Sequence, residues 1–213
     1  MSMKMHKSRH ARIIMYKMSY VVGIDEAGRG PLAGPVAVGA VSIPANFNKR
    51  FFQSIRDSKK LTPKDRELWF QLALEARKKG ELDFRVSLVS ERVIDRKGIS
   101  YAIRLGIKRS LTTLDVPEDS QIFLDGGIRA PAKFTHQLTV VKGDEKIPVI
   151  SLASIMAKVV RDKKMVKLSK KFPKFGFDIH KGYGTRMHIT AIRKYGPTEL
   201  HRRTFLKRLT KSR

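Results

Sequence analysis

The 213-residue sequence contains no cysteine, a single tryptophan and only 19 acidic residues. The missing cysteines exclude disulfide bonds and thiolate-ligated metals, and they suit a reducing compartment. No apolar run approaches the roughly 20 residues that a membrane-spanning helix needs. We therefore expect a cytoplasmic globular protein without a membrane partner, and nothing in the sequence demands more than a monomer.

The few acids are outnumbered by 45 lysines and arginines, which give a formal net charge of +26. A field of this size and sign attracts polyanions, and each phosphate that it neutralises releases counterions. Nucleic acid is therefore the expected partner. Charge alone leaves other interpretations open, namely a ribosome-associated or packaging protein, or a surface kept soluble by repulsion.

The chain is expected to form one domain between two basic ends. Residues 1–19 are basic and lack an acid, so we interpret them as a flexible arm that contacts phosphates, with an organelle transit peptide as the alternative. Residues 20–205 would form the domain and residues 206–213 a basic tail. A chain of this length is long enough to bury a substantial core.

Short β-branched runs bounded by glycine or proline alternate with amphipathic stretches, which is typical of an α/β protein. Strands are predicted over residues 20–25, 36–43, 82–89, 121–125 and 137–142, and helices over 62–79, 90–97, 100–114, 150–172 and 186–195. This order favours a mixed sheet flanked by helices. The early part of the 150–172 helix is rich in small residues, which would let it pack closely on the sheet.

Acidic residues stand at the ends of two predicted strands. Asp25 and Glu26 close the first strand and are the first acids in the chain, and Asp125 closes another strand just before two glycines. Open α/β sheets bind ligands beyond the carboxyl ends of their strands, and clustered carboxylates suit Mg²⁺ or Mn²⁺. Asp125 alone would indicate a turn residue. When Asp25 and Glu26 are considered with it, a metal site is as good an interpretation of Asp125 as a turn residue.

Asp144 follows a further strand-like run and precedes the long predicted helix, so it is either a fourth carboxylate of this cluster or a turn residue. Four neighbouring carboxylates repel one another unless cations lie among them. In two-metal phosphoryl chemistry one ion activates water and the other stabilises the leaving oxygen. The sequence therefore points to metal-dependent chemistry on a nucleic acid.

Two further loops have the composition of phosphate or sugar contacts. Ser58 and Lys59 place a hydroxyl and an ammonium group in a predicted loop, which suits a phosphate contact. Tyr183 stands between two glycines, so backbone can approach a ligand while the ring packs on a sugar or base. The alternative is that the ring only fills space in the protein interior.

The second half of the 150–172 helix is basic, and it is interpreted as a ridge that follows phosphates or as a solvated face. Its basic residues are Lys158, Arg161, Lys163, Lys164, Lys167, Lys170 and Lys171. His188 and His201 are interpreted as structural, because no histidine pair has a convincing zinc spacing.

Taken together, these segments resemble the type 2 ribonuclease H family, ribonuclease HII. The resemblance spans about residues 20–205, and its motifs follow the family's order at residues 23–31, 57–61, 124–126, 142–144, 151–162, 181–185 and 201–203. It implies an RNase H-like mixed sheet with a C-terminal helical extension. It also implies cleavage of the RNA strand of RNA/DNA hybrids, and incision 5′ of single ribonucleotides embedded in duplex DNA.

The resemblance implies metal-activated water as nucleophile, 3′-hydroxyl and 5′-phosphate ends, and a role in removing ribonucleotides during DNA replication and repair. It assigns catalysis and metal binding to Asp25, Glu26, Asp125 and Asp144. It assigns substrate contacts to Gly28, Arg29, Gly30, Ser58, Lys59, Lys142 and Tyr183. The glycine-arginine-glycine loop would read the ribose 2′-hydroxyl, and Tyr183 would sense a neighbouring deoxyribose.

Two other function classes remain as alternatives at this point. A non-catalytic RNA- or DNA-binding protein explains the charge but gives no reason for acids at strand ends. A different metal nuclease on a related fold, for example one acting on branched DNA, would explain both.

Overall fold

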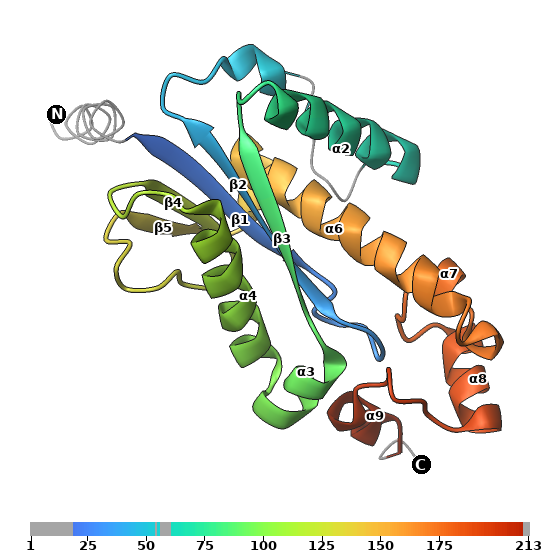
Figure 1. Ribbon diagram of the computed structural model, residues 1–213. Helices are drawn as coiled ribbons and strands as arrows, with labels where there is room; N and C mark the ends of the chain where they lie inside the picture. The colour runs from blue at the N-terminus through green and yellow to red at the C-terminus, as the bar shows by residue number, and fades with distance from the viewer. Residues whose placement is uncertain (1–18, 54, 56–60, 211–213) are drawn as a thin grey trace, which may run out of the picture.

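The computed structural model describes residues 19–53, 55 and 61–210. Expectations for the arm up to residue 18, and for Ser58 and Lys59, lie outside the described residues. A five-stranded sheet in the order β3-β2-β1-β4-β5 forms the centre, with helices on both faces (Figure 1). Its strands are β1 (Tyr20–Ala27), β2 (Val36–Pro44), β3 (Asp83–Val89), β4 (Gln121–Asp125) and β5 (Gln137–Val140). The predicted mixed α/β sheet is confirmed.

The pairing pattern decides where the strand-terminal acids meet. Strand β1 runs antiparallel to β2 but parallel to β4, with Ile24 opposite Leu124. Because the carboxyl ends of parallel strands lie at the same end of a sheet, the residues that follow this pair, Asp25 and Asp125, lie side by side at that end of the adjacent strands. The register alone therefore brings two predicted site residues together.

Helices cover the two faces of the sheet unequally, and several gather at its far end (Figure 1). They are α2 (Pro63–Lys78), α3 (Glu91–Lys97), α4 (Ile99–Leu114), α5 (Gly143–Lys146), α6 (Pro148–Ser169), α7 (Phe177–His180), α8 (Arg186–Tyr195) and α9 (Arg203–Thr210), with short 3₁₀ turns η1 (Lys49–Phe52) and η2 (Pro173–Phe175). Helix α4 packs on one face, and α6 with α2 lies on the other. Helices α7, α8 and α9 form the expected C-terminal helical extension.

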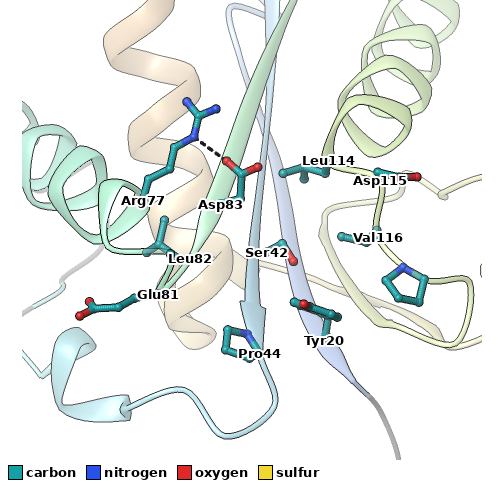
Figure 2. A pocket seen from close by; sticks show the side chains of 12 residues that line it. Tyr20, Ser42, Pro44, Arg77, Glu81, Leu82, Asp83, Leu114, Asp115 and Val116 are labelled. Atoms are coloured by element: carbon teal, nitrogen blue, oxygen red, sulfur yellow. Dashed lines mark ion pairs between the residues drawn. The ribbon is translucent and has the colours of Figure 1, made fainter.

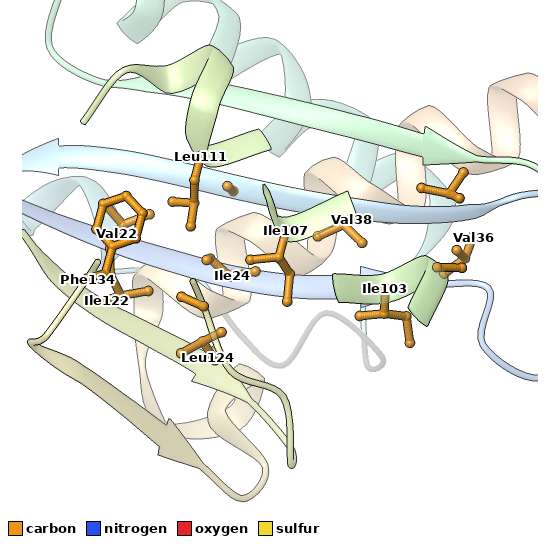
Figure 3. Packing of buried hydrophobic residues seen from close by; sticks show 14 of the residues in the cluster. Val22, Ile24, Val36, Val38, Ile103, Ile107, Leu111, Ile122, Leu124 and Phe134 are labelled. Carbon is orange, nitrogen blue, oxygen red and sulfur yellow. The ribbon is translucent and has the colours of Figure 1, made fainter. Parts of the chain in front are cut away.

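The face under α4 is a hydrophobic core built from alternate strand residues. Val22 and Ile24 of β1 point to this face and pack against Ile103, Ile107 and Leu111 of α4 (Figure 3). These α4 residues recur every four positions, which places them on one helix face. Their burial fixes the register of the central strand and therefore the position of the acids that follow it.

The opposite face allows α6 to approach the sheet closely. A side chain at Gly23 would collide with the backbone of Val149, and one at Gly39 would collide with the carbonyl of Ala153. The buried early part of α6 is rich in alanine and serine, so the predicted close packing of this helix on the sheet is confirmed. This approach also places Ser154 beside the carboxyl end of β1, where it bonds Asp25.

Some predicted boundaries were wrong for local reasons. Strand β5 ends at Val140 rather than at residue 142, because Lys142 adopts left-handed backbone with φ of 55° and α5 begins at Gly143. Strand β1 continues to Ala27, which pairs with Ala37 of β2. Helix α9 spans Arg203–Thr210 and so includes the proposed start of the basic tail, and the division into arm, domain and tail stays a prediction.

Candidate active site

The predicted acids gather at the carboxyl end of β1 and β4. Asp25 is almost fully buried, with 5% of its surface exposed. The Gly143 amide donates a hydrogen bond of 2.7 Å to Oδ1 of Asp125, so the turn that carries Asp144 is attached directly to the end of β4. Asp144 itself is 2% exposed. The structure thus places Asp25, Glu26 and Asp125 together, with the backbone of Asp144 beside them.

Burial and mutual repulsion disfavour negative charge in this cluster. Burial raises the pKa of Asp25 to about 8, helped by the charges of Glu26 and Asp125 and opposed by a hydrogen bond from Ser154. Burial also raises the pKa of Glu26, while the Arg29 guanidinium at 3.0 Å opposes that rise and Asp125 adds to it. A bound cation would stabilise the ionised forms.

The donor set fits a hard divalent ion, because all of its side-chain donors are carboxylate oxygens. The side chains do not yet converge on one point. Among residues 19–53, 55 and 61–210, no group of three or more histidines, cysteines and acids is arranged as an ion site. Instead Glu26 bonds Arg29, and Asp125 bonds the Gly143 amide. Ion binding would therefore require these carboxylates to rotate toward a shared centre.

The loop after β1 is held by a buried arginine that sequence reasoning did not single out. Arg202 is fully buried and donates hydrogen bonds to the carbonyls of Gly28, Arg29 and Gly34 at 2.7, 3.0 and 3.0 Å. Burial, with the neighbouring charge of Arg161, lowers the pKa of Arg202 to about 9, so the guanidinium stays charged at neutral pH. The only sequence signal was its place in the motif at residues 201–203.

Arg161 supports the same loop, so its assignment to an exposed basic ridge was wrong. It is fully buried and donates to the carbonyls of Pro35 and Ala33. The reason is helical geometry, since position 161 faces the sheet while Lys163, Lys164 and Lys167 face outward. One of these exposed lysines, Lys163, bonds Glu67 at 2.8 Å.

Tyr183 lies on a loop that is joined to the loop after β1. The Gly182 carbonyl accepts a hydrogen bond of 2.8 Å from the Leu32 amide. The Tyr183 ring is 41% exposed, and the cations of Lys158 and Arg161 lie 5.6 and 5.7 Å from its centre. An exposed ring beside cations is available to pack on a nucleotide.

The remaining predicted contacts lie at the rim of the cluster. The Arg29 side chain is 56% exposed, and the Lys142 side chain is 67% exposed with its ammonium 3.7 Å from Glu145. A side chain at Gly30 would meet nothing within 4 Å, so the space above this backbone is open to a ligand.

A separate cavity of about 570 Å³ lies at the other end of the sheet, between Tyr20, Ser42 and Leu114 (Figure 2). Arg77 and Asp83 form an ion pair of 2.6 Å on its wall. Tyr20 begins β1 and Asp25 comes near its end, so this cavity is remote from the acids. In the described part of the chain, no helix is long and apolar enough to cross a membrane.

Comparison with known proteins places the chain in a family. A family model described as Ribonuclease HII matches residues 22–209. Ribonuclease HII of Caldicellulosiruptor bescii is 43% identical over 190 residues, covering 89% of this chain and 88% of the relative. Ribonuclease HII of Natranaerobius thermophilus is 45% identical over 188 residues, covering 88% of this chain and 91% of the relative.

Solved structures share the fold. The ribonuclease H2 from Pyrococcus horikoshii OT3 superposes with a TM-score of 0.70 at 28% identity, over 91% of this chain and 100% of that one. Bst-RNase HIII, solved in complex with Mn²⁺, superposes with a TM-score of 0.66 at 18% identity, over 94% of this chain and 74% of that one. The family model and the curated relatives both cover nearly the whole domain, and the chain therefore belongs to the ribonuclease HII family.

Proposed function

We propose that this type 2 ribonuclease H acts on two substrates, cleaving the RNA strand of RNA/DNA hybrids and incising duplex DNA 5′ of single embedded ribonucleotides. Family membership makes the chain an RNase H endonuclease and sets aside a purely binding role. The observation that supports the finer substrate choice is the joined pair of loops beside the acids. One contains residues 28–30 with open space above Gly30, and the other carries the exposed Tyr183 ring.

In the proposed mechanism, two Mg²⁺ or Mn²⁺ ions would be held by Asp25, Glu26, Asp125 and Asp144. The Mn²⁺ complex of Bst-RNase HIII supports the choice of ion type. Bound there, divalent ions supply the Lewis acidity that lowers the pKa of water and stabilises the departing 3′-oxygen. The expected products are a 3′-hydroxyl and a 5′-phosphate. The bound ions would in turn favour the ionised forms of these acids, whose charge burial otherwise disfavours.

The substrate loops would select the sugar. The 2′-hydroxyl is the one group that separates a ribonucleotide from a deoxyribonucleotide, and the open space at Gly30 would let backbone groups of this loop approach it. Tyr183 would pack on the neighbouring deoxyribose. Arg29, Lys142, Ser58 and Lys59 would contact the phosphates on either side.

Incubation with a DNA duplex that holds one ribonucleotide tests the proposal. We expect a nick 5′ of the ribonucleotide with Mg²⁺ or Mn²⁺, none with EDTA, and none in the matched all-deoxy duplex. Extension by a DNA polymerase would identify the 3′-hydroxyl. Cleavage of a long RNA/DNA hybrid without cleavage of the single-ribonucleotide duplex would refute the finer proposal and leave the RNase H activity intact.

We further propose that the protein acts as a monomer in the cytoplasm, in removing ribonucleotides during DNA replication and repair. Cleavage beside an embedded ribonucleotide would be the first step of that removal. A single species of monomer mass by light scattering, at the protein concentration of the cleavage assay, would support the first part. A dimer under those conditions would contradict it.

A further inference from the structure

Three histidines form a buried chain beneath the Tyr183 loop. His188 and His201 are 0 and 2% exposed, and His180 is 8% exposed. The rings of His180 and His188 stack at 4.3 Å, and Nε2 of His188 lies 3.1 Å from Nε2 of His201. They come from the end of α7, the first turns of α8 and the segment before α9. The catalytic proposal above gives them no role.

The hydrogen-bond partners fix which nitrogen of each ring carries the proton. Nδ1 of His201 accepts from the Thr198 amide at 2.9 Å, so the proton of neutral His201 must lie on Nε2. That proton can only point to Nε2 of His188, which must therefore accept. His188 then carries its proton on Nδ1, where it donates to the Tyr183 carbonyl at 2.9 Å.

The contact between His188 and Tyr183 fixes the same tautomer of His188 independently. The Tyr183 carbonyl is an acceptor, so Nδ1 of His188 has to be the donor whatever His201 does. His180 completes the pattern, because its Nδ1 accepts from the Gly182 amide at 3.1 Å and its Nε2 donates to the Phe175 carbonyl at 2.6 Å. One arrangement of neutral rings satisfies every contact.

The chain holds the backbone on both sides of one substrate-facing ring. The Gly182 amide is bonded to His180 and the Tyr183 carbonyl to His188, while the Tyr183 side chain stays 41% exposed. The Phe177 ring packs edge-on against His180 and His188, and Phe175 packs against His201. Asp178 and Lys181 lie near His180, and Arg203 lies near His201.

We propose that His201, His188 and His180 are positioning residues, which as neutral rings in a single set of tautomers orient Tyr183 toward the substrate sugar. The proposal rests on the substrate role proposed above for Tyr183. A second proton on Nε2 of His188 would face the N–H of His201, and one on Nδ1 of His201 would face the Thr198 amide, so either would push apart the rings that support the Tyr183 loop.

Long-range ¹H–¹⁵N correlation spectra of the wild-type protein at pH 7 test the tautomers without an activity assay. We expect the proton on Nε2 of His201, Nδ1 of His188 and Nε2 of His180, with all three rings neutral. Exposed His136 serves as the internal reference for an ordinary histidine. A proton on Nδ1 of His201 or on Nε2 of His188 would overturn the proposal.

A double-mutant cycle tests the positioning role. On the single-ribonucleotide duplex we expect H188F to lower kcat/KM about tenfold. The Tyr183 ring would still be present but misplaced, and misplacing a group that contacts substrate slows the reaction. In a Y183A background, H188F should change kcat/KM less than twofold, because the ring that it orients is already gone. The control variant H136Q should leave kcat/KM unchanged both in the wild-type protein and in the Y183A variant.

An equal loss from H188F in both backgrounds would show that the chain serves folding alone and would overturn the positioning role. If H188F does not fold, H201Q is used in the same cycle, and the spectra of the wild-type protein still decide the tautomers. Failure of the wild-type enzyme to cut the single-ribonucleotide duplex would count against the proposed substrate instead, and the spectra separate the two cases.

Discussion

Two of the acids proposed for catalysis, Asp25 and Glu26, lie in an environment that disfavours their charge. Asp25 is 5% exposed, and burial raises its pKa to about 8 although two further acids lie beside it. A protein selected only for stability would not collect such groups, whereas sites that bind cations and perform proton chemistry commonly do. The ion pair between Glu26 and Arg29 offsets part of this cost.

Asp125→Asn should remove cleavage while keeping substrate binding. The amide keeps the oxygen that accepts from Gly143 at 2.7 Å but lacks the charge that an ion requires. We expect kcat to fall at least about 100-fold, the scale seen when one preorganised electrostatic group is lost. Cleavage of the single-ribonucleotide duplex gives kcat, and fluorescence anisotropy gives Kd. Exposed Asp119→Asn is the control, and full activity of Asp125→Asn would remove this residue from the site.

The loops and helices that surround the acids are joined by buried side chains rather than by a continuous core. Arg202, just before α9, holds three carbonyls of the loop that follows β1. Below the neighbouring loop, the histidine chain connects α7, α8 and the segment before α9. These contacts couple the C-terminal helices to the substrate loops, because buried polar groups must keep their partners.

Arg202→Lys should destabilise the protein, because an ammonium group on a longer, flexible stem cannot reproduce the planar guanidinium fork. Leaving two of the three carbonyls without a donor is expected to lower the free energy of unfolding by about 2–4 kcal/mol. Urea denaturation measures the loss. Its neighbour Arg203, whose side chain is exposed, provides the matched control, Arg203→Lys. We call the hydrogen bonds from Arg202 to the carbonyls of Gly28, Arg29 and Gly34 the clamp. Equal stability of the two variants would contradict its role in holding the loop after β1.

The two buried histidines should contribute less stability as the pH falls through the histidine range, while Asp25, with a folded pKa of about 8, acts in the opposite sense. Burial lowers the pKa of both His188 and His201 to about 4, from an ordinary value of 6.5. Between those values the unfolded chain binds protons that the folded chain excludes, so this contribution is complete above pH 6.5 and is lost as the pH falls toward 4. Urea midpoints at pH 7.5 and 5.5 should differ more for wild type than for H188F. An unchanged difference would argue against buried neutral rings.

At the scale of the whole molecule, a net charge of +26 surrounds a small group of buried acids. The field concentrates nucleic acid near the surface without regard to sequence. Under the proposed function, selection is left to the two loops joined through Leu32 and Gly182. Affinity and selectivity should therefore respond to different changes.

Binding should weaken steeply with salt. If four phosphates are neutralised, the affinity for duplex should fall roughly 100-fold between 50 and 200 mM salt. Anisotropy titrations with the Asp125→Asn protein measure this slope without cleavage. The ratio of affinities for ribonucleotide-containing and all-deoxy duplexes should change little over the same range. An affinity independent of salt would refute the electrostatic account.

The features that could be predicted from the sequence are those with a local pattern. Asp25 and Asp125 end hydrophobic runs before glycines, so the strand pattern placed both at the edge where they are found. It did not locate the clamp, because Arg202 and Gly28 are 174 positions apart and only folding brings them together. It also misplaced Arg161, whose neighbours in sequence are lysines of an exposed face. Long-range partners of buried polar groups leave no periodic signal.

The contact between Arg202 and the Gly28 carbonyl also has a consequence for synthesis on the ribosome. The chain segment that supplies the clamp is made 174 residues after the loop that needs it. All five strands of the sheet, the last of which ends at Val140, are therefore synthesised before the arginine that holds this loop. Under the proposed function, support for the loop that selects the sugar would be completed only after the last strand has been made.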